Sequence, residues 1–502
     1  MARRGIKAPG PRVQNRCTFP ISLCAMPHSP STTAPPDLDA LFRAQQAHAP
    51  VMRATTTAER RDRLTRLQDA LQVHRSAIQD ALHADLRKAP VEVDLTELKT
   101  TLDEIQHALD HLDTWMTPDR VDTPLLYTGT RSEVRYEPKG VVLIMAPWNY
   151  PLNLTLGPLV GALAAGNCAI LKPSEHAPKT AALLADLIGS LFDKREIAVV
   201  QGGPDVAQAL TAKPFDHIYF TGSPTIGRKV MAAAAEHLTS VTLELGGKSP
   251  AVVDASANLS HAAGRIAWSK FTNAGQTCIA PDYVLVEDPV YDSLVDHLID
   301  HIHQFYGPTP TAKRASDDYA RLIHDDHFES IVGLLSDAIE RGATLATGGQ
   351  HDADERYVAP TVLTDVPLDA DLMQQEIFGP LLPVLPYTSL EEALHIINER
   401  PTPLSLYLFS EEEATVETVL QRTTAGSTCV NEGFLHFNNP GLPFGGKDES
   451  GIGRGHGRYA FEAFSNERAV LRRTYGAKLI RAFYPPFDRL TSRLTDWLLR
   501  LF

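Results

Sequence analysis

Between residues 141 and 245, short apolar runs alternate with longer segments of helical periodicity, and this alternation restricts the possible folds more than any other feature. We expect strands at 141–146, 168–171, 197–200, 217–220 and 241–245. We expect helices between them at 152–165, 180–192 and 225–238. Strands that alternate with helices form a doubly wound parallel sheet, which binds ligands at the carboxyl ends of its strands. Residues 139–246 are therefore predicted to form such a sheet.

The segment before this sheet is predicted to be helical. From Glu59 to Met116, leucine and isoleucine recur at steps of three and four residues, which indicates two amphipathic helices broken near Ala89-Pro90. Residues 37–117 would then be a helical part of the same domain. Residues 118–138 alternate poorly and contain three prolines and a glycine, so we expect a hairpin that bridges domains or subunits.

A second alternating block follows at residues 247–439. Its clearest strands are expected at 251–253 and 283–286, and its clearest helices at 261–271 and 391–398. The block indicates a second α/β domain. A chain of 502 residues is too long for one hydrophobic core, so several domains are expected. Residues 440–502 are predicted to be a return segment with a role in oligomerisation.

Charge and cysteine content restrict the partners and the compartment. The formal net charge of −14 argues against nucleic-acid binding, which depends on clustered lysine and arginine. The five cysteines are scattered without a C-x-x-C pair, which favours a reducing, cytoplasmic environment. Residues 1–36 make a poor signal peptide, and we interpret them as a disordered extension or the product of an over-early start codon.

The last residues, 481–502, have an amphipathic pattern. Leucines and Trp497 fall on one helical face, with arginines around them. Such a segment is typical of docking against a partner subunit, which we favour, and also of contact with a membrane surface.

Cys278 is the first candidate for chemistry. It stands in Asn-Ala-Gly-Gln-Thr-Cys, a turn-prone stretch between an expected helix and an expected strand, where substrate can reach a thiol. A single cysteine is more often an inert buried side chain, so its surroundings must decide between the two interpretations.

Glu244 and Asn149 provide those surroundings. Glu244 ends an apolar strand and precedes two glycines, so partial desolvation should raise its pKa toward the working pH of a general base. Asn149 follows the first strand of the sheet, where its amide can donate a hydrogen bond to a developing oxyanion. The histidine pairs His301-x-His303 and His324-x-x-His327 are interpreted as solvated helix faces, so no metal site is predicted.

Several motifs together resemble the aldehyde dehydrogenase superfamily, over residues 38–486. They are Pro147 to Pro151, Lys172 to Glu175, Phe220 to Ser223, Leu243 to Lys248, Gly275 to Cys278 and Glu376 to Pro380. Cys278 to Tyr283, Pro403 to Ser410 and Tyr484 to Pro486 favour the class 3-like branch, whose members act on medium and long aliphatic or aromatic aldehydes and are usually dimers. The resemblance implies an α/β aldehyde dehydrogenase-like fold, with a Rossmann-type cofactor domain, an α/β catalytic domain and a small oligomerisation element.

The resemblance also implies a role for each matching residue. Cys278 would be the nucleophile, Glu244 the general base, and Asn149 part of the oxyanion hole. The cofactor residues implied in the same way are Lys172, Glu175, Gly222, Ser223, Gly227, Leu245, Glu376 and Phe378. Tyr150, Trp268 and Phe437 are expected near the substrate tunnel, although any hydrophobic core also contains such residues.

The expected cofactor is NAD, with NADP possible. Residues 223–227 open a helix directly after a strand, and a helix N-terminus suits a pyrophosphate. The carboxylate of Glu175 should accept hydrogen bonds from ribose hydroxyls and repel a 2′-phosphate. The expected reaction is oxidation of an apolar aldehyde through a thiohemiacetal and a thioester on Cys278. A cysteine-dependent thioester or ester hydrolase, or an acyl-transferring relative, is the alternative.

Overall fold

A parallel sheet is the centre of the first half of the fold, as the alternating pattern predicted. The computed structural model describes residues 37–124, 127, 129–473 and 484–500, so the expectation for residues 1–36 lies outside the described residues. The six strands lie in the order β17-β7-β6-β3-β4-β5, and all neighbours are parallel except β17 and β7. They are β3 (Val141–Met145), β4 (Cys168–Lys172), β5 (Ile197–Val199), β6 (His217–Thr221), β7 (Ser240–Glu244) and β17 (Gly451–Ile452).

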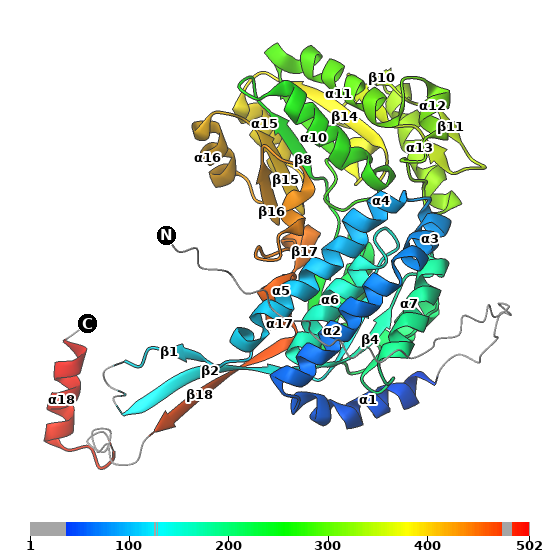
Figure 1. Ribbon diagram of the computed structural model, residues 1–502. Helices are drawn as coiled ribbons and strands as arrows, with labels where there is room; N and C mark the ends of the chain where they lie inside the picture. The colour runs from blue at the N-terminus through cyan, green and yellow to red at the C-terminus, as the bar shows by residue number, and fades with distance from the viewer. Residues whose placement is uncertain (1–36, 125–126, 128, 474–483, 501–502) are drawn as a thin grey trace, which may run out of the picture. The chain divides into compact units, whose positions relative to one another are not determined.

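Helices cover both faces of this sheet because successive residues of its buried strands point to opposite faces. Val142 and Ile144 of β3 belong to one hydrophobic core, and Val141, Leu143 and Met145 to another. The first core is shared with α2, α3, α5, α6 and α7, which run beside one another in Figure 1. The helices around the sheet are α1 (Leu38–Arg53), α2 (Thr57–Val73), α3 (Arg75–Leu86), α4 (Pro90–Val93), α5 (Lys99–Trp115), α6 (Asn153–Ala165), α7 (Pro178–Leu191), α8 (Pro204–Thr211), α9 (Pro224–Ala235) and α17 (Gly457–Ala463).

Residues 59–116, which were predicted to form two helices, are divided into more than two helical elements. The stretch before Ala89 is divided in two at His74, whose ψ of 13° is not helical and which separates α2 from α3. Both halves bury leucines in the same core, so the apolar spacing continued across the break and concealed it. Beyond α4, a π-helical turn, η1 (Asp94–Leu98), leads into α5.

A second sheet of seven strands contains the later α/β block. Its order is β10-β13-β14-β9-β8-β15-β16, with only the β10–β13 pair antiparallel. Its strands are β8 (Pro250–Val253), β9 (Tyr283–Glu287), β10 (Thr344–Thr347), β13 (Thr361–Thr364), β14 (Leu381–Tyr387), β15 (Ser405–Phe409) and β16 (Ser427–Val430). The other elements of this region are α10 (Leu259–Phe271), η3 (Thr272–Gly275), η4 (Asp288–Val290), α11 (Tyr291–Tyr306), α12 (Pro310–Ala315), α13 (Asp325–Glu340), β11 (His351–Asp352), β12 (Tyr357–Val358), α14 (Asp371–Gln374), α15 (Leu390–Asn398), α16 (Glu413–Arg422), η5 (Phe434–Asn438) and η6 (Asp448–Ser450).

The hairpin expected at 118–138 is present and gains a third strand from the end of the chain. β1 (Asp119–Val121) and β2 (Thr130–Pro138) are antiparallel, and β18 (Ser465–Arg473) pairs with β2 along its full length. Figure 1 shows β18 beside β2 although more than 300 residues separate them. β18 is an edge strand of this sheet, and α18 (Arg489–Leu499) follows it in the described chain. Across the residues that the structure describes, no helix has the length and apolar content needed to cross a membrane.

Candidate active site

Cys278 lies in a tight turn between α10 and β9, as the sequence indicated. The turn depends on left-handed backbone at Asn273, Ala274 and Gly275, with φ of 54°, 52° and 76°. A Cβ on Gly275 would lie 2.3 Å from the carbonyl oxygen of Gly379, so only glycine fits there. Cys168 and Cys429 are buried, whereas Cys278 is partly exposed and lines a cavity. Burial, together with the negative charges of Glu376 and Glu244, raises the pKa of the Cys278 thiol to about 12.

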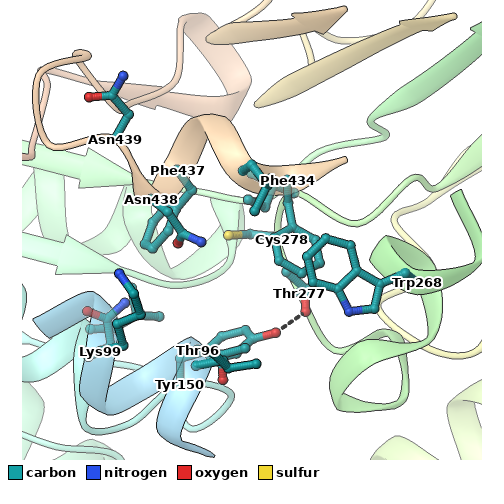
Figure 2. A pocket seen from close by; sticks show the side chains of 15 residues that line it. Thr96, Lys99, Tyr150, Trp268, Thr277, Cys278, Phe434, Phe437, Asn438 and Asn439 are labelled. Atoms are coloured by element: carbon teal, nitrogen blue, oxygen red, sulfur yellow. Dashed lines mark hydrogen bonds between the residues drawn. The ribbon is translucent and has the colours of Figure 1, made fainter. Parts of the chain in front are cut away.

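The cavity beside Cys278 has a volume of about 460 Å³ and mainly apolar walls (Figure 2). Tyr150, Trp268 and Phe437, the three residues expected near a substrate tunnel, all line it. Figure 2 shows the sulfur of Cys278 pointing toward Phe437 and Asn438. The sequence analysis missed the remaining wall, which consists of Leu95, Thr96, Lys99, Asn153, Leu154, Thr277, Ile279, Phe434, Leu435, Asn438 and Asn439.

Asn149 is hydrogen-bonded to the turn that contains Cys278. It follows β3, is 2% exposed, and its amide Nδ2 donates to the main-chain oxygen of Gln276, at 3.0 Å. In return, Nδ2 of Asn273 donates to the main-chain oxygen of Asn149, at 2.9 Å. The Oδ1 atom of Asn149 is buried and has no hydrogen-bond partner. Through the Nδ2 hydrogen bond the amide is fixed to the main chain two residues before Cys278.

A buried ion pair, which sequence reasoning missed, holds the Asn149 loop from behind. Lys88 and Glu97 are both 0% exposed, and Nζ of Lys88 lies 2.8 Å from Oε1 of Glu97. Nζ also donates to the main-chain oxygen of Asn149, at 2.8 Å, and sits 3.9 Å above the ring of Tyr150. The other carboxylate oxygen of Glu97 accepts from the main-chain N–H groups of residues 152 and 153.

One feature of the sequence could have indicated the buried ion pair of Lys88 and Glu97. Glu97 lies four residues from both Val93 and Thr101, which are buried on the same side of the helical segment. A charged residue in register with buried neighbours needs an opposite charge or hydrogen bonds.

Glu244 ends β7, as expected, and is 4% exposed. The hydroxyl of Tyr219 donates to its Oε1, at 3.2 Å, while Oε2 is buried without a partner. Burial raises the pKa of Glu244 to about 8, against the opposing effects of Tyr219 and Arg454. Glu244 and Cys278 both line a small hollow of about 30 Å³. A carboxylate that has a pKa near neutrality and shares a small hollow with a thiol is suited to accept protons.

The carboxyl ends of β3, β4 and β6 surround a second cleft, of about 1000 Å³. β3 is the first strand of the sheet and has β4 on one side and β6 on the other, so the cleft lies where the strand order reverses. Four of the expected cofactor residues line it: Lys172, Glu175, Gly222 and Ser223.

The residues of this cleft fit a dinucleotide. Nζ of Lys172 donates to Oε2 of Glu175, at 2.7 Å. Although partial burial opposes it, this hydrogen bond helps to hold the pKa of Glu175 below its ordinary value, which keeps an acceptor ready for ribose hydroxyls. Ser223 caps the 12-residue helix α9 through its hydroxyl, and that helix N-terminus faces the cleft, where it suits a phosphate.

The other expected cofactor residues lie outside the lining of this cleft. Gly227 is buried against Leu245, whose side chain a Cβ on Gly227 would meet at 2.7 Å. Glu376 approaches Gly246, and burial raises the pKa of Glu376 to about 8. Phe378 has a φ of 50° and packs edge-on against Trp148, with ring centroids 5.4 Å apart. Trp148 itself lines the cleft, so Phe378 stands directly behind its wall.

The interpretation of the histidine pairs as solvated helix faces was wrong for the second pair. Nε2 of His327 lies 2.9 Å from the main-chain oxygen of Phe378, and its ring packs 5.4 Å from Trp148. Burial lowers the pKa of His327 to about 4. His324 accepts the N–H of His327 as the N-cap of α13. Within the described ranges, no group of three or more metal-ligating side chains is found.

Comparison with known proteins gives consistent results for sequence and fold. The profile of the "Aldehyde dehydrogenase family" matches residues 24–470. The chain is 44% identical over 446 residues to aldehyde dehydrogenase family 3 member B2 of Mus musculus, which covers 89% of this chain and 91% of the mouse protein.

Two solved structures show the same fold. The substrate-bound state of Staphylococcus aureus AldH superposes with a TM-score of 0.87 at 41% identity, covering 92% of this chain and 99% of that one. An NAD⁺ complex of aldehyde dehydrogenase from Bacillus cereus gives a TM-score of 0.79 at 29% identity, covering 87% and 89%.

Proposed function

This chain belongs to the aldehyde dehydrogenase family, and we propose that it oxidises apolar aldehydes to carboxylic acids through a thioester on Cys278. One observation supports the catalytic roles proposed for Cys278 and Glu244. Cys278 lies between an apolar cavity large enough for an aldehyde and a hollow that also contains Glu244. The thiol therefore has access to a substrate on one side and to a base on the other.

The first step needs a thiolate and a polarised carbonyl. An aldehyde has no leaving group other than hydride, so a nucleophile must first convert it to a tetrahedral adduct. The sulfur of Cys278 attacks the carbonyl carbon, and the thiol proton passes to Glu244. The amide of Asn149 stabilises the oxyanion as the C–S bond forms, because its position is fixed before the reaction begins.

The cofactor supplies one chemical capacity, which is acceptance of the hydride by the nicotinamide of NAD or NADP. Loss of that hydride leaves a thioester on Cys278. Lys172 and Glu175 would hold the adenosine ribose, and Ser223 at the start of α9 the pyrophosphate. We propose that NAD is preferred, because the ionised carboxylate of Glu175 would repel a 2′-phosphate.

The second step is hydrolysis of the thioester. Oε2 of Glu244 is buried without a partner and can take a proton from a water in the 30 Å³ hollow. Attack of that water forms the C–O bond and breaks the C–S bond, so the acid is released and the departing sulfur takes the proton from Glu244, which restores the thiol. An ionised Glu244 also favours water over a bulky acyl acceptor, because the hollow is too small for more than water.

Aromatic and aliphatic side chains around Cys278 support an apolar substrate. The rings of Trp268 and Phe434 lie 4.5 Å apart, and Phe437 packs edge-on against Phe444 at 4.8 Å. An apolar aldehyde gains about 25 cal/mol for each Å² of surface that it buries against such walls. The cavity also has polar side chains, which include Lys99, Asn438 and Asn439, so a substrate can make polar contacts at a few positions.

The proposed assembly is a homodimer in the cytoplasm. Among the described residues β18 is the outer strand of its sheet, and a second copy can continue the sheet along it. Leu490, Trp497 and Leu499 of α18 are more than half exposed and would be covered in the same interface. The thiols of Cys168, Cys278 and Cys429 are free, which suits a reducing compartment. Binding of α18 to a membrane surface is the other outcome to test, by comparing vesicle sedimentation with the mass in solution.

The decisive experiment is aldehyde oxidation by the purified protein. Reduction of NAD and of NADP is followed by nicotinamide absorbance across straight-chain and aromatic aldehydes, with Cys278→Ala beside the wild type. We expect reduction by the wild type, no reduction by the variant, and higher kcat/KM for apolar substrates. A folded protein that binds NAD but reduces none with any aldehyde would overturn the proposal and indicate ester or thioester chemistry.

A further inference from the structure

The hollow between Cys278 and Glu244 contains two more ionisable groups, Glu104 and His456. Its other walls are largely apolar, and its volume of about 30 Å³ has room for one or two water molecules. A water needs several polar partners to stay in such a space, and these four side chains provide them. The hollow therefore connects the base of the proposed reaction to a second acid–base pair.

His456 and Glu104 are held together in a defined geometry. Nδ1 of His456 lies 3.2 Å from Oε1 of Glu104, and their side chains are only 14% and 8% exposed. Oε2 of Glu104 accepts the main-chain N–H of Gly457, at 2.9 Å. The imidazole is packed between the rings of Phe437 and Phe444, with centroids 4.5 and 5.1 Å away. The backbone at His456 has a φ of 69°, a strained conformation that this set of contacts maintains.

The pair continues outward to the protein surface along α5. His107 lies one helical turn from Glu104, is partly exposed, and interacts with the Glu104 charge. Its ring is 4.3 Å from that of His111, which is exposed. Burial raises the pKa of Glu104 to about 7, so this carboxyl can hold and release a proton near neutral pH. A series of titratable groups thus leads from the hollow to solvent.

The proposed reaction needs such a route. Glu244 takes the thiol proton in the first step, so it must be ionised again before it can take a proton from the attacking water in the second step. Glu244 is 4% exposed, and its one described side-chain partner is the hydroxyl of Tyr219, which already donates to it. One proton therefore leaves Glu244 between the two steps of every turnover, and the carboxyl is too deeply buried to give it directly to bulk solvent.

We propose that His456 and Glu104 form a proton exit route from Glu244, an inference that rests on the proposed function. The proton on Glu244 passes to a water in the hollow, and that water gives a proton to the imidazole of His456. His456 releases its Nδ1 proton to Glu104, and Glu104 passes a proton to solvent beside His107. No bond to carbon changes, and the imidazole, which ends with its proton on Nε2, returns to the Nδ1–H tautomer by a ring flip before it relays the next proton.

The test uses an ester substrate, so that the cofactor is not needed. Para-nitrophenyl acetate acylates a reactive cysteine directly; the initial burst of nitrophenol reports acylation, and the steady rate reports deacylation. Glu104→Gln keeps the shape and the acceptor for Gly457 but is a poor proton carrier. We expect an unchanged burst, with a steady rate reduced by about 10- to 100-fold and a larger solvent deuterium isotope effect.

Two further variants make the result specific. His456→Asn tolerates positive φ but cannot relay a proton, and should show the same division between burst and steady rate. Asp113→Asn is an exposed change on the same helix and should behave as the wild type. If Glu104→Gln and His456→Asn deacylate at the wild-type rate, or if burst and steady rate fall together, the exit route is refuted. If the wild type itself shows no Cys278-dependent burst, the proposed function fails instead.

Discussion

Substitutions in the buried ion pair of Lys88 and Glu97 are predicted to change the stability and the catalytic rate of the protein to different extents. Glu97→Gln removes the counterion to which the ammonium of Lys88 is hydrogen-bonded, at a position that is 0% exposed. Removal of one partner of a buried pair costs about 3–5 kcal/mol, because the other charge stays desolvated. Lys88→Met should cost a similar amount by leaving the carboxylate of Glu97 unpaired.

The double variant Lys88→Met/Glu97→Gln should be more stable than either single variant. It contains no buried charge, and the glutamine oxygen can still accept a main-chain N–H from residue 152 or 153. One N–H loses its acceptor, so we expect the double variant to lose only about 1–3 kcal/mol relative to the wild type. Activity should not recover with stability, because the main-chain oxygen of Asn149 has lost the Lys88 donor. A shift of the Asn149 loop by about 1 Å would reduce kcat by about 100-fold.

Urea unfolding, followed by tryptophan fluorescence, measures the stability of the four proteins, and the initial rate of aldehyde oxidation measures their catalysis. Trp148 stands next to Asn149, so its emission also reports on the loop. The reasoning is refuted if the two single losses simply add in the double variant, since uncoupled losses would mean that the two charges do not stabilise each other. Recovery of full activity in the double variant would refute the positioning of Asn149 by Lys88.

Three further predictions concern the residues of the reaction. Asn149→Ala should lower kcat by about 100- to 1000-fold with a smaller effect on KM, as steady-state kinetics will show, because the oxyanion loses a prearranged donor. Glu244 acts as a base only when ionised and has a raised pKa of about 8, so the steady rate should rise with pH up to about 8 and level off above it; in Glu244→Gln this rise should vanish. Persistence of the same pH profile in that variant would assign the titration to another group. Glu175→Gln removes the charge beside the ribose site and should raise the NADP-to-NAD ratio of kcat/KM roughly tenfold, or about 1.4 kcal/mol; an unchanged ratio would exclude Glu175 as the discriminating group.

The site residues that could be predicted from the sequence are those whose positions depend on a few neighbouring residues. Glu244 and Asn149 each follow an apolar strand, and parallel strands bring their carboxyl ends to one edge of a sheet. Cys278 stands in a turn whose glycine is visible in the sequence. Apolar strands and glycine turns are properties of a few neighbouring residues, so these positions could be located without knowledge of the tertiary structure.

The parts that sequence did not predict depend on contacts between distant segments. Lys88 meets the carbonyl of Asn149 across 61 residues, and Gly457 meets Glu104 across 353. A histidine pair at helical spacing carries no sign that the ring of His327 will pack against Trp148. The break at His74 was hidden because the apolar period runs through it on both sides. Periodicity reports which face is buried, but not which partner buries it.

The two pKa values at the centre of the site explain why the Asn149 loop is supported so heavily. The thiol of Cys278 has a pKa of about 12 and the carboxyl of Glu244 about 8, both raised mainly by burial. Transfer of the proton from thiol to carboxylate is therefore unfavourable in this arrangement. Thiolate is a minor species, and its attack becomes productive only if the resulting oxyanion is stabilised at once. A prearranged donor typically supplies about 3–4 kcal/mol of such stabilisation. The buried charges of Lys88 and Glu97 thus hold in place the group on which the first chemical step depends most.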